Sequence, residues 1–284
     1  MNSICILTDN TAQFPQPAFL GRDLVHVLPL SIKLNDELID DTREIKKLIL
    51  PITAGDTLHP AVVPPSPDRL VQLFQALNRD YNEIVVITVS SKLNGTFSAI
   101  QEAIRIFPGG SRIHLIDSLT ISIGLGILVQ IAAESAYSGL KAKEIDRKLR
   151  EVIPHIYSYF CTPSLSYLYH AGFIDYAQAK VSEYLNLYPL FILEDGQLSP
   201  QQKVRSYRNA LESFQEFLDE FDHLRQISLI QGGNLPPQET RQIKQFSDEN
   251  FPKTPFTEHQ ITPYLATMFG PSFLGLFIHE NSSQ

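Results

Sequence analysis

Hydrophobic positions in the first half of the chain alternate between two patterns, short β-prone runs and longer stretches with helical spacing. The β-prone runs cover residues 3–7, 25–32, 84–89 and 112–116. The helical stretches cover residues 67–78, 96–106, 122–138 and 141–151. The run at 84–89 is continuous and β-branched, which is typical of a strand covered on both faces. The alternation predicts an α/β fold with a mostly parallel sheet flanked by helices on both faces.

After about residue 155 the pattern changes, which indicates a second, smaller α+β domain. An apolar run at 187–193 is followed by a hairpin-type turn at 194–197 with the sequence Glu-Asp-Gly-Gln. Helices are expected at 207–221 and 236–250, and strands at 226–231 and 273–278. We therefore predict an N-terminal domain over residues 1–156 and a C-terminal domain over residues 157–284.

Composition and charge narrow the possible partners. The 284 residues are 43% hydrophobic, so the chain can bury a core, and the formal net charge of −8 argues against nucleic acid as a partner. No stretch of about 20 apolar residues occurs, so no stable membrane insertion is expected. The apolar run before Asp9 is too short for a signal peptide, which favours a cytoplasmic location. No metal-binding spacing or nucleotide-binding motif is present, so no cofactor is expected.

Small polar residues follow several of the predicted strands. Thr8 ends the first strand, Ser91 follows the strand at 84–89, and Ser118 follows the strand at 112–116. Ligands of open α/β sheets bind beyond the carboxyl ends of the strands, where helix starts also present free N–H groups. A rim of hydroxyls and amides without clustered Lys or Arg suits a carboxylate better than a triphosphate.

Each of these residues also has a structural interpretation. Thr8 and Asp117 could be turn residues, and Ser66 before Pro67 fits a helix N-cap. A Ser–His–Asp arrangement that uses Ser91 stays open, although no histidine is singled out and no Gly-x-Ser-x-Gly motif occurs.

The strand-end motifs resemble those of the DegV family. Residues 8–15 (TDNTAQFP) resemble the family's opening TDSTADLP, and residues 90–97 (SSKLNGTF) resemble SSxLSGTY. Further blocks agree in order at residues 27–30, 65–67, 116–126, 196–205 and 270–275. Several blocks in the right order are more specific than any one of them.

The resemblance implies a two-domain α/β protein that holds a long-chain fatty acid in a buried apolar tunnel between its domains. Small hydroxyl residues at the rim would hold the carboxylate, and the protein itself would perform no chemistry. Several family members present the fatty acid to a separate kinase subunit, so a fatty acid kinase is an implied partner. By position, Ser66, Ser118 and Thr8 belong to the implied rim.

Some family positions differ in this chain. Val62 and Val63 replace a Thr-Ser pair, and Asn94 replaces the serine of the LSGT motif. Because one hydroxyl is lost, we expect the contacts to the carboxylate to be rebuilt around Asn94, Ser91 and Thr96. Gly95, between Asn94 and Thr96, belongs to the same predicted site. The valine makes the entrance to the predicted tunnel more apolar.

Basic residues of the family are also replaced. Phe173 stands in place of an arginine, Tyr188 in place of a lysine and Met268 in place of a histidine, whereas Arg205 is kept. These losses weaken the expectation of phosphate chemistry but not that of an apolar tunnel. Two other functions stay open, a hydrolase or phosphotransferase at the same crevice and a degenerate scaffold that binds only protein.

Overall fold

The structure is a computed structural model that describes residues 4–35, 37–39, 60–163, 165–233 and 237–281. It divides into two compact units. Unit 1 comprises Met1–Ser31, Val63–His155 and Asp195–Gln197, and unit 2 comprises Ile32–Val62, Ile156–Glu194 and Leu198–Gln284. The predicted domains 1–156 and 157–284, with a lipid between them, stay a prediction.

Unit 1 is built on a four-stranded sheet in which all neighbouring strands are parallel. The strand order is β2-β1-β6-β7. The bounds are β1 (Ile4–Asp9), β2 (Val25–Leu28), β6 (Glu83–Thr88) and β7 (Ile113–Asp117). Every residue of β1 is buried, as are five of the six residues of β6. This burial is expected of a parallel sheet with helices on both faces, and it explains the continuous apolar run in the sequence.

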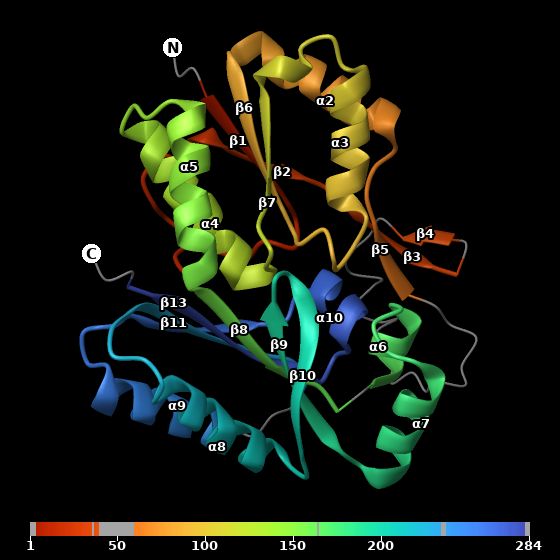
Figure 1. Ribbon diagram of the computed structural model, residues 1–284, viewed down its shortest axis with the longest axis vertical. Helices are drawn as coiled ribbons and strands as arrows, with labels where there is room; N and C mark the ends of the chain where they lie inside the picture. The colour runs from red at the N-terminus through yellow and green to blue at the C-terminus, as the bar shows by residue number, and fades with distance from the viewer. Residues whose placement is uncertain (1–3, 36, 40–59, 164, 234–236, 282–284) are drawn as a thin grey trace. The chain divides into compact units, whose positions relative to one another are not determined.

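Two pairs of helices cover the two faces of this sheet. They are α2 (Pro67–Asp80), α3 (Thr96–Ile106), α4 (Ser122–Tyr137) and α5 (Ala142–Val152). In Figure 1, α2 and α3 lie on one side of the sheet, and α4 and α5 lie on the other. Short 3-10 turns occur at Arg22–Leu24, Gly110–Arg112 and Ile153–His155. The predicted α/β fold class is therefore confirmed.

One predicted strand is interrupted. The apolar run at 25–32 forms β2 and then β3 (Ser31–Leu34), which belong to different sheets. Pro29 lies between them, and proline has no N–H to continue the ladder of hydrogen bonds. The pattern of apolar residues could not distinguish one strand from two.

Unit 2 contains a six-stranded mixed sheet with the order β10-β9-β8-β13-β11-β12. The bounds are β8 (Ile156–Cys161), β9 (Tyr188–Glu194), β10 (Gln197–Val204), β11 (Leu224–Gln231), β12 (Phe256–Gln260) and β13 (Leu274–Glu280). Strands β11 and β12 are parallel, while β8 pairs antiparallel with both β9 and β13. Antiparallel pairing dominates, in agreement with the predicted α+β character.

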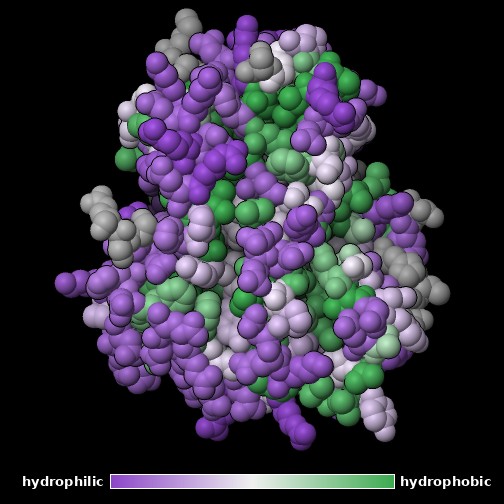
Figure 2. Space-filling view, viewed as in Figure 1, coloured by the Kyte–Doolittle hydropathy of each residue, from purple (hydrophilic) through white to green (hydrophobic). Residues whose placement is uncertain are grey.

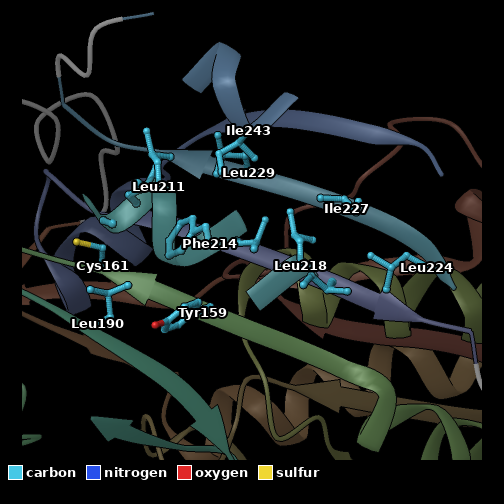
Figure 3. Packing of buried hydrophobic residues seen from close by; sticks show 14 of the residues in the cluster. Tyr159, Cys161, Leu190, Leu211, Phe214, Leu218, Leu224, Ile227, Leu229 and Ile243 are labelled. Carbon is cyan, nitrogen blue, oxygen red and sulfur yellow. The ribbon is translucent and has the colours of Figure 1, made fainter. Parts of the chain in front are cut away.

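The core of unit 2 lies between this sheet and two helices, α8 (Tyr207–Leu218) and α9 (Pro237–Asn250). Phe214 of α8 packs on Tyr159 of β8 with ring centroids 5.2 Å apart. Figure 3 shows Phe214 and Leu218 together with side chains from β8 and β11. Ser206 caps α8 by accepting a hydrogen bond from the backbone N–H of Asn209, which fixes where the helix begins.

The remaining elements of unit 2 are short. They are the helices α6 (Leu165–His170), α7 (Tyr176–Leu185) and α10 (Pro263–Phe269), and a small sheet of β4 (Glu37–Ile39), β3 and β5 (Pro60–Val63). The predicted hairpin turn between β9 and β10 is confirmed by positive φ angles of 48° at Asp195 and 81° at Gly196. No helix in the described ranges has the length and apolar character needed to cross a bilayer.

Candidate functional site

The carboxyl ends of β1 and β6 form the point in unit 1 where the strand order reverses. The chain passes from β1 to β2 on one side, and then to β6 and β7 on the other side of β1. A reversal of this kind leaves a crevice beyond the strand ends, where open α/β sheets bind their ligands. The strand-end residues of the sequence motifs therefore lie at the position that the topology favours.

Asp9 connects the two strand ends. It is fully buried, and its carboxyl group accepts hydrogen bonds from the backbone N–H groups of Thr11, at 3.0 Å, and of Val89, at 2.7 Å. The hydroxyl of Thr11 donates to it as well. Burial raises the pKa of Asp9, and these hydrogen bonds oppose that rise. Asp9 thus holds the loops after β1 and β6 in place.

The loop after β6 leads into the start of α3. The side-chain oxygen of Asn94 accepts a hydrogen bond of 2.9 Å from the backbone N–H of Thr96. Gly95 is the N-cap of α3 and has no side chain that could cap the helix. A Cβ added at this position would meet no atom within 4 Å. The space over this helix start is therefore open, and the first N–H groups of the helix have no partner within the helix.

Several buried polar atoms around these strand ends have no hydrogen-bond partner among the described residues. They are Thr8 Oγ1, Asn10 Oδ1, Thr88 Oγ1, Asn94 Nδ2 and Thr96 Oγ1. Buried polar groups without partners are rare in folded proteins, so a cluster of them calls for an explanation. The amide of Asn94 and the hydroxyls can donate hydrogen bonds, which a carboxylate would accept.

Other predicted rim residues hold the backbone instead. Ser118 Oγ donates to the carbonyl of Thr120 and accepts from its N–H, which is a turn interaction. The backbone N–H of Ser91 donates to Asp117 at 3.1 Å, and so does that of Leu119. The hydroxyl of Ser118 is thus paired within its turn, so its place at the rim stays a prediction, while the N–H of Ser91 fixes the loop before α3.

Ser66 occupies the N-cap position of α2 but makes no side-chain cap hydrogen bond, and it is exposed. Proline at the next position has no N–H and needs no acceptor, so one of the N–H groups that a helix N-cap usually helps to satisfy is absent. Ser66 is thus separate from the unpartnered cluster. The cluster includes Thr8, Asn94 and Thr96 among the predicted residues.

Unit 2 has an apolar cavity of about 630 Å³. Residues of α6 and α7, with the segment between them, form one part of its lining, and residues of β9 and β10, with Leu187, form another. The lining residues are Leu165, Phe173, Ile174, Ala177, Gln178, Val181, Ser182, Leu187, Pro189, Phe191, Leu198, Pro200, Gln201, Gln202 and Lys203. Its volume lies within the range of about 300–1,000 Å³ that is usual for small-molecule sites.

The walls of this cavity have side chains that suit an alkyl chain. Phe173 lines the cavity and stacks on Phe269 of α10, with the ring planes 11° apart and the centroids 6.1 Å apart. Two of the polar lining residues are already paired. Gln178 completes the capping box of α7 with Asp175, and Gln202 donates to the hydroxyl of Tyr159.

The outer side of α7 is unusually apolar for an exposed helix. Tyr176, Val181, Tyr184 and Leu185 are each at least half exposed, and Tyr184 reaches 86%. Figure 2 shows hydrophobic side chains gathered over this part of unit 2, at the lower right. Because Val181 also lines the cavity, the apolar surface continues from the helix exterior into the cavity wall.

The other predicted residues of unit 2 lie elsewhere. Val62 in β5 and Met268 in α10 are buried, and Arg205 after β10 is exposed. Tyr188 packs edge-on against Tyr207. Of the predicted ligand residues in unit 2, Phe173 is the one that lines the cavity. No group of three or more His, Cys, Asp or Glu in the described part of the chain could hold a metal ion.

Sequence reasoning missed Asp9, Thr88 and most of the cavity lining. Asp9 stands at the end of the first strand, so the strand-end rule could have selected it. The cavity gave no such signal, since apolar side chains that line a void have the same composition as those that fill a core. Leu165 of α6 lines the cavity, whereas Leu168 of the same helix is fully buried and does not.

Comparison with known proteins adds evidence that is independent of this geometry. The family described as "Uncharacterised protein, DegV family" matches residues 3–281. A DegV domain-containing protein of Caldanaerobacter subterraneus is 27% identical, over 99% of this chain and 100% of its own length.

Solved structures share the fold. A DegV family protein from Thermus thermophilus, described as binding fatty acid, superposes with a TM-score of 0.80 at 22% identity, covering 98% of this chain and 100% of its own. The Streptococcus pneumoniae fatty acid kinase B3 protein, loaded with linoleic acid, superposes with a TM-score of 0.82 at 18% identity and the same coverage.

Proposed function

The chain belongs to the DegV family, and on that premise we propose that it binds a long-chain fatty acid and performs no chemistry on it. The observation that carries the proposal is the apolar cavity of about 630 Å³ in unit 2. Burial of each CH₂ group contributes about 0.8 kcal/mol, so an alkyl chain gains most of its affinity from apolar walls alone.

For the carboxylate, the proposed partners are the donors at the start of α3. Asn94 Nδ2 and Thr96 Oγ1 are buried and have no partner in the described part of the chain, and the space over Gly95 is open. Hydrogen bonds to a charged acceptor contribute about 1.5–3 kcal/mol each, which is enough to orient a head group. Asn94 thus supplies a donor in place of the family's serine.

We extend the proposal to a separate kinase subunit as partner, to which the carboxylate would be presented. The support is the Streptococcus pneumoniae structure, whose protein is described as part of a fatty acid kinase. Arg205, the basic residue kept at a family position, is exposed and available to a partner. Replacement of Arg205 by alanine should lower acyl phosphate formation by such a kinase and leave fatty acid uptake intact.

The decisive experiment is native mass spectrometry of the purified protein, with extraction and identification of any bound lipid. We expect a long-chain fatty acid at one per chain. A protein that carries no lipid and takes up no fatty acid in titration would refute the proposal. Turnover of acyl esters or acyl phosphates that is abolished by Ser91→Ala would instead favour the hydrolase or phosphotransferase alternative.

A further inference from the structure

Among the described residues that line the unit 2 cavity, Ser182 has a buried polar group without a hydrogen-bond partner. It lies on α7, is only 4% exposed, and is one of the lining residues. Its hydroxyl has no hydrogen-bond partner among the described residues. A hydroxyl that is both removed from water and unpaired is unfavourable in the ligand-free protein.

Two buried serines in other helices pair their hydroxyls within the helix, whereas Ser247 in α9 is buried and unpaired like Ser182 but does not line the cavity. Ser135 in α4 donates to the carbonyl of Ile131 at 2.7 Å, and Ser213 in α8 donates to that of Asn209 at 3.1 Å. This bond to the carbonyl four residues earlier is the usual solution for a serine inside a helix. Ser182 makes no such bond to the carbonyl of Gln178, so its hydroxyl is available to another group.

Two other polar residues of the cavity lining have different partners and do not bond to the hydroxyl of Ser182. Gln178 is held by the N-cap of α7, and the side-chain amide of Gln202 donates to the hydroxyl of Tyr159. Rotation about the Cα–Cβ bond of Ser182 carries its hydroxyl between staggered positions on the wall that the residue lines. A polar group of a ligand in the cavity can therefore supply the partner that the described residues do not.

We infer that the cavity selects a fatty acid that carries a hydroxyl group along its chain, and that this hydroxyl pairs with Ser182. The inference rests on the proposed fatty acid function and makes its ligand more specific. A plain alkyl chain would fill the cavity but leave the serine hydroxyl unpaired. A hydroxylated chain forms one O–H···O hydrogen bond with the serine, in which one hydroxyl donates and the other accepts, and so recovers part of the hydrogen bonding that both groups lose on leaving water.

The test is a competition titration of the full chain with saturated fatty acids of one length. The parent acid is compared with a series that carries a single hydroxyl at successive chain positions. We expect one positional isomer to bind about tenfold more tightly than the parent acid, and Ser182→Ala to remove that preference so that the two bind equally. Ser213→Ala, which removes a paired helical serine outside the cavity lining, should keep the preference.

Two results would overturn the inference. In one, every hydroxy acid binds no better than the parent acid, which leaves the fatty acid function standing and removes only the role of Ser182. In the other, the preference persists in Ser182→Ala. Failure of all the acids to bind, parent included, would refute the proposed function itself and with it the inference.

Discussion

The carboxyl group of Asp9 accepts a hydrogen bond of 2.7 Å from the backbone N–H of Val89. Asp9 is the last residue of β1, and Val89 follows the adjacent strand β6, 80 positions later in the sequence. The bond therefore joins the two loops at the reversal point of the sheet.

Asp9→Asn should destabilise the protein. An amide cannot accept on both sides as the carboxyl group does, so at least one N–H of Thr11 or Val89 loses its acceptor while still buried. We expect the free energy of unfolding to fall by about 1–3 kcal/mol in urea denaturation. An unchanged denaturation midpoint would contradict the structural role of Asp9.

The same substitution should change the pH dependence of stability. Burial raises the pKa of Asp9 in the folded state, so between its ordinary and raised values the folded protein keeps a proton that the unfolded chain has released. This contribution to stability is complete below the ordinary value and is lost as the pH rises through the raised one. The deficit of D9N relative to the wild type should therefore shrink with rising pH. A stability difference between wild type and D9N that grows with pH would show that folding lowers the pKa of Asp9 instead.

Thr96→Val should keep or raise the stability of the ligand-free protein but lower its affinity for fatty acid. The hydroxyl is fully buried and unpaired, so its replacement by a methyl group should leave the ligand-free protein as stable as the wild type or more so. Fatty acid affinity should fall about tenfold, equivalent to 1.4 kcal/mol, because one donor to the carboxylate is lost. Ser98→Ala, at an exposed position of the same helix, is the matched control for calorimetric titration. Equal affinities in both variants would remove Thr96 from the site.

Ala177→Phe should narrow the cavity of unit 2. Ala177 is an exposed lining residue of α7, so folding should tolerate the ring while the chamber loses volume. If two methylene groups are excluded, affinity should drop about tenfold, at about 0.8 kcal/mol per CH₂. Longer acids should lose more than shorter ones in a chain-length series. Ala76→Phe, an exposed alanine of α2, should bind every acid as the wild type does.

Asp175→Ala should loosen α7 selectively. Asp175 caps this helix by accepting a hydrogen bond of 2.8 Å from the backbone N–H of Gln178. Loss of an N-cap costs about 0.5–2 kcal/mol, and a helix of 10 residues has few other contacts to compensate. Hydrogen exchange should quicken in residues 176–185 and remain slow in α8, whose cap at Ser206 is unaltered.

Gly126→Ala should disturb the loop that follows β1. A Cβ at Gly126 would collide with the backbone of Gln13 and Phe14, which cannot move aside as a flexible side chain can. We expect a loss of about 1–3 kcal/mol in the free energy of unfolding. Gly95→Ala, where the added methyl group meets no atom within 4 Å, is the comparison for an uncrowded glycine.

Most of unit 1 could be predicted from the sequence because its strands and helices are each indicated by a local pattern of apolar residues. The β-branched run of β6 and the spacing of α3 needed no knowledge of the rest of the chain. The strand-end rule then selected Thr8, and the family resemblance added Asn94 and Thr96. Ser118 was selected by the same rule, but its hydroxyl is used within a turn. Which strand-end hydroxyls remain unpaired depends on backbone geometry that no residue pattern records.

Unit 2 was harder to predict for a physical reason. Helix α7 exposes Val181, Tyr184 and Leu185, so it lacks the regular polar face from which a surface helix is recognised. Strand β12 pairs at the edge of the sheet through residues that alternate only weakly. The cavity itself depends on how far apart the walls stand, which is a property of packing and not of composition.

Helices α6 and α7 contribute to the cavity lining without belonging to any strand ladder of the structure. Substitutions on these two helices can reshape the chamber while leaving every strand register untouched. The part of the lining that comes from α6 and α7 can therefore vary in evolution while the strand pairing, and with it the fold, is kept.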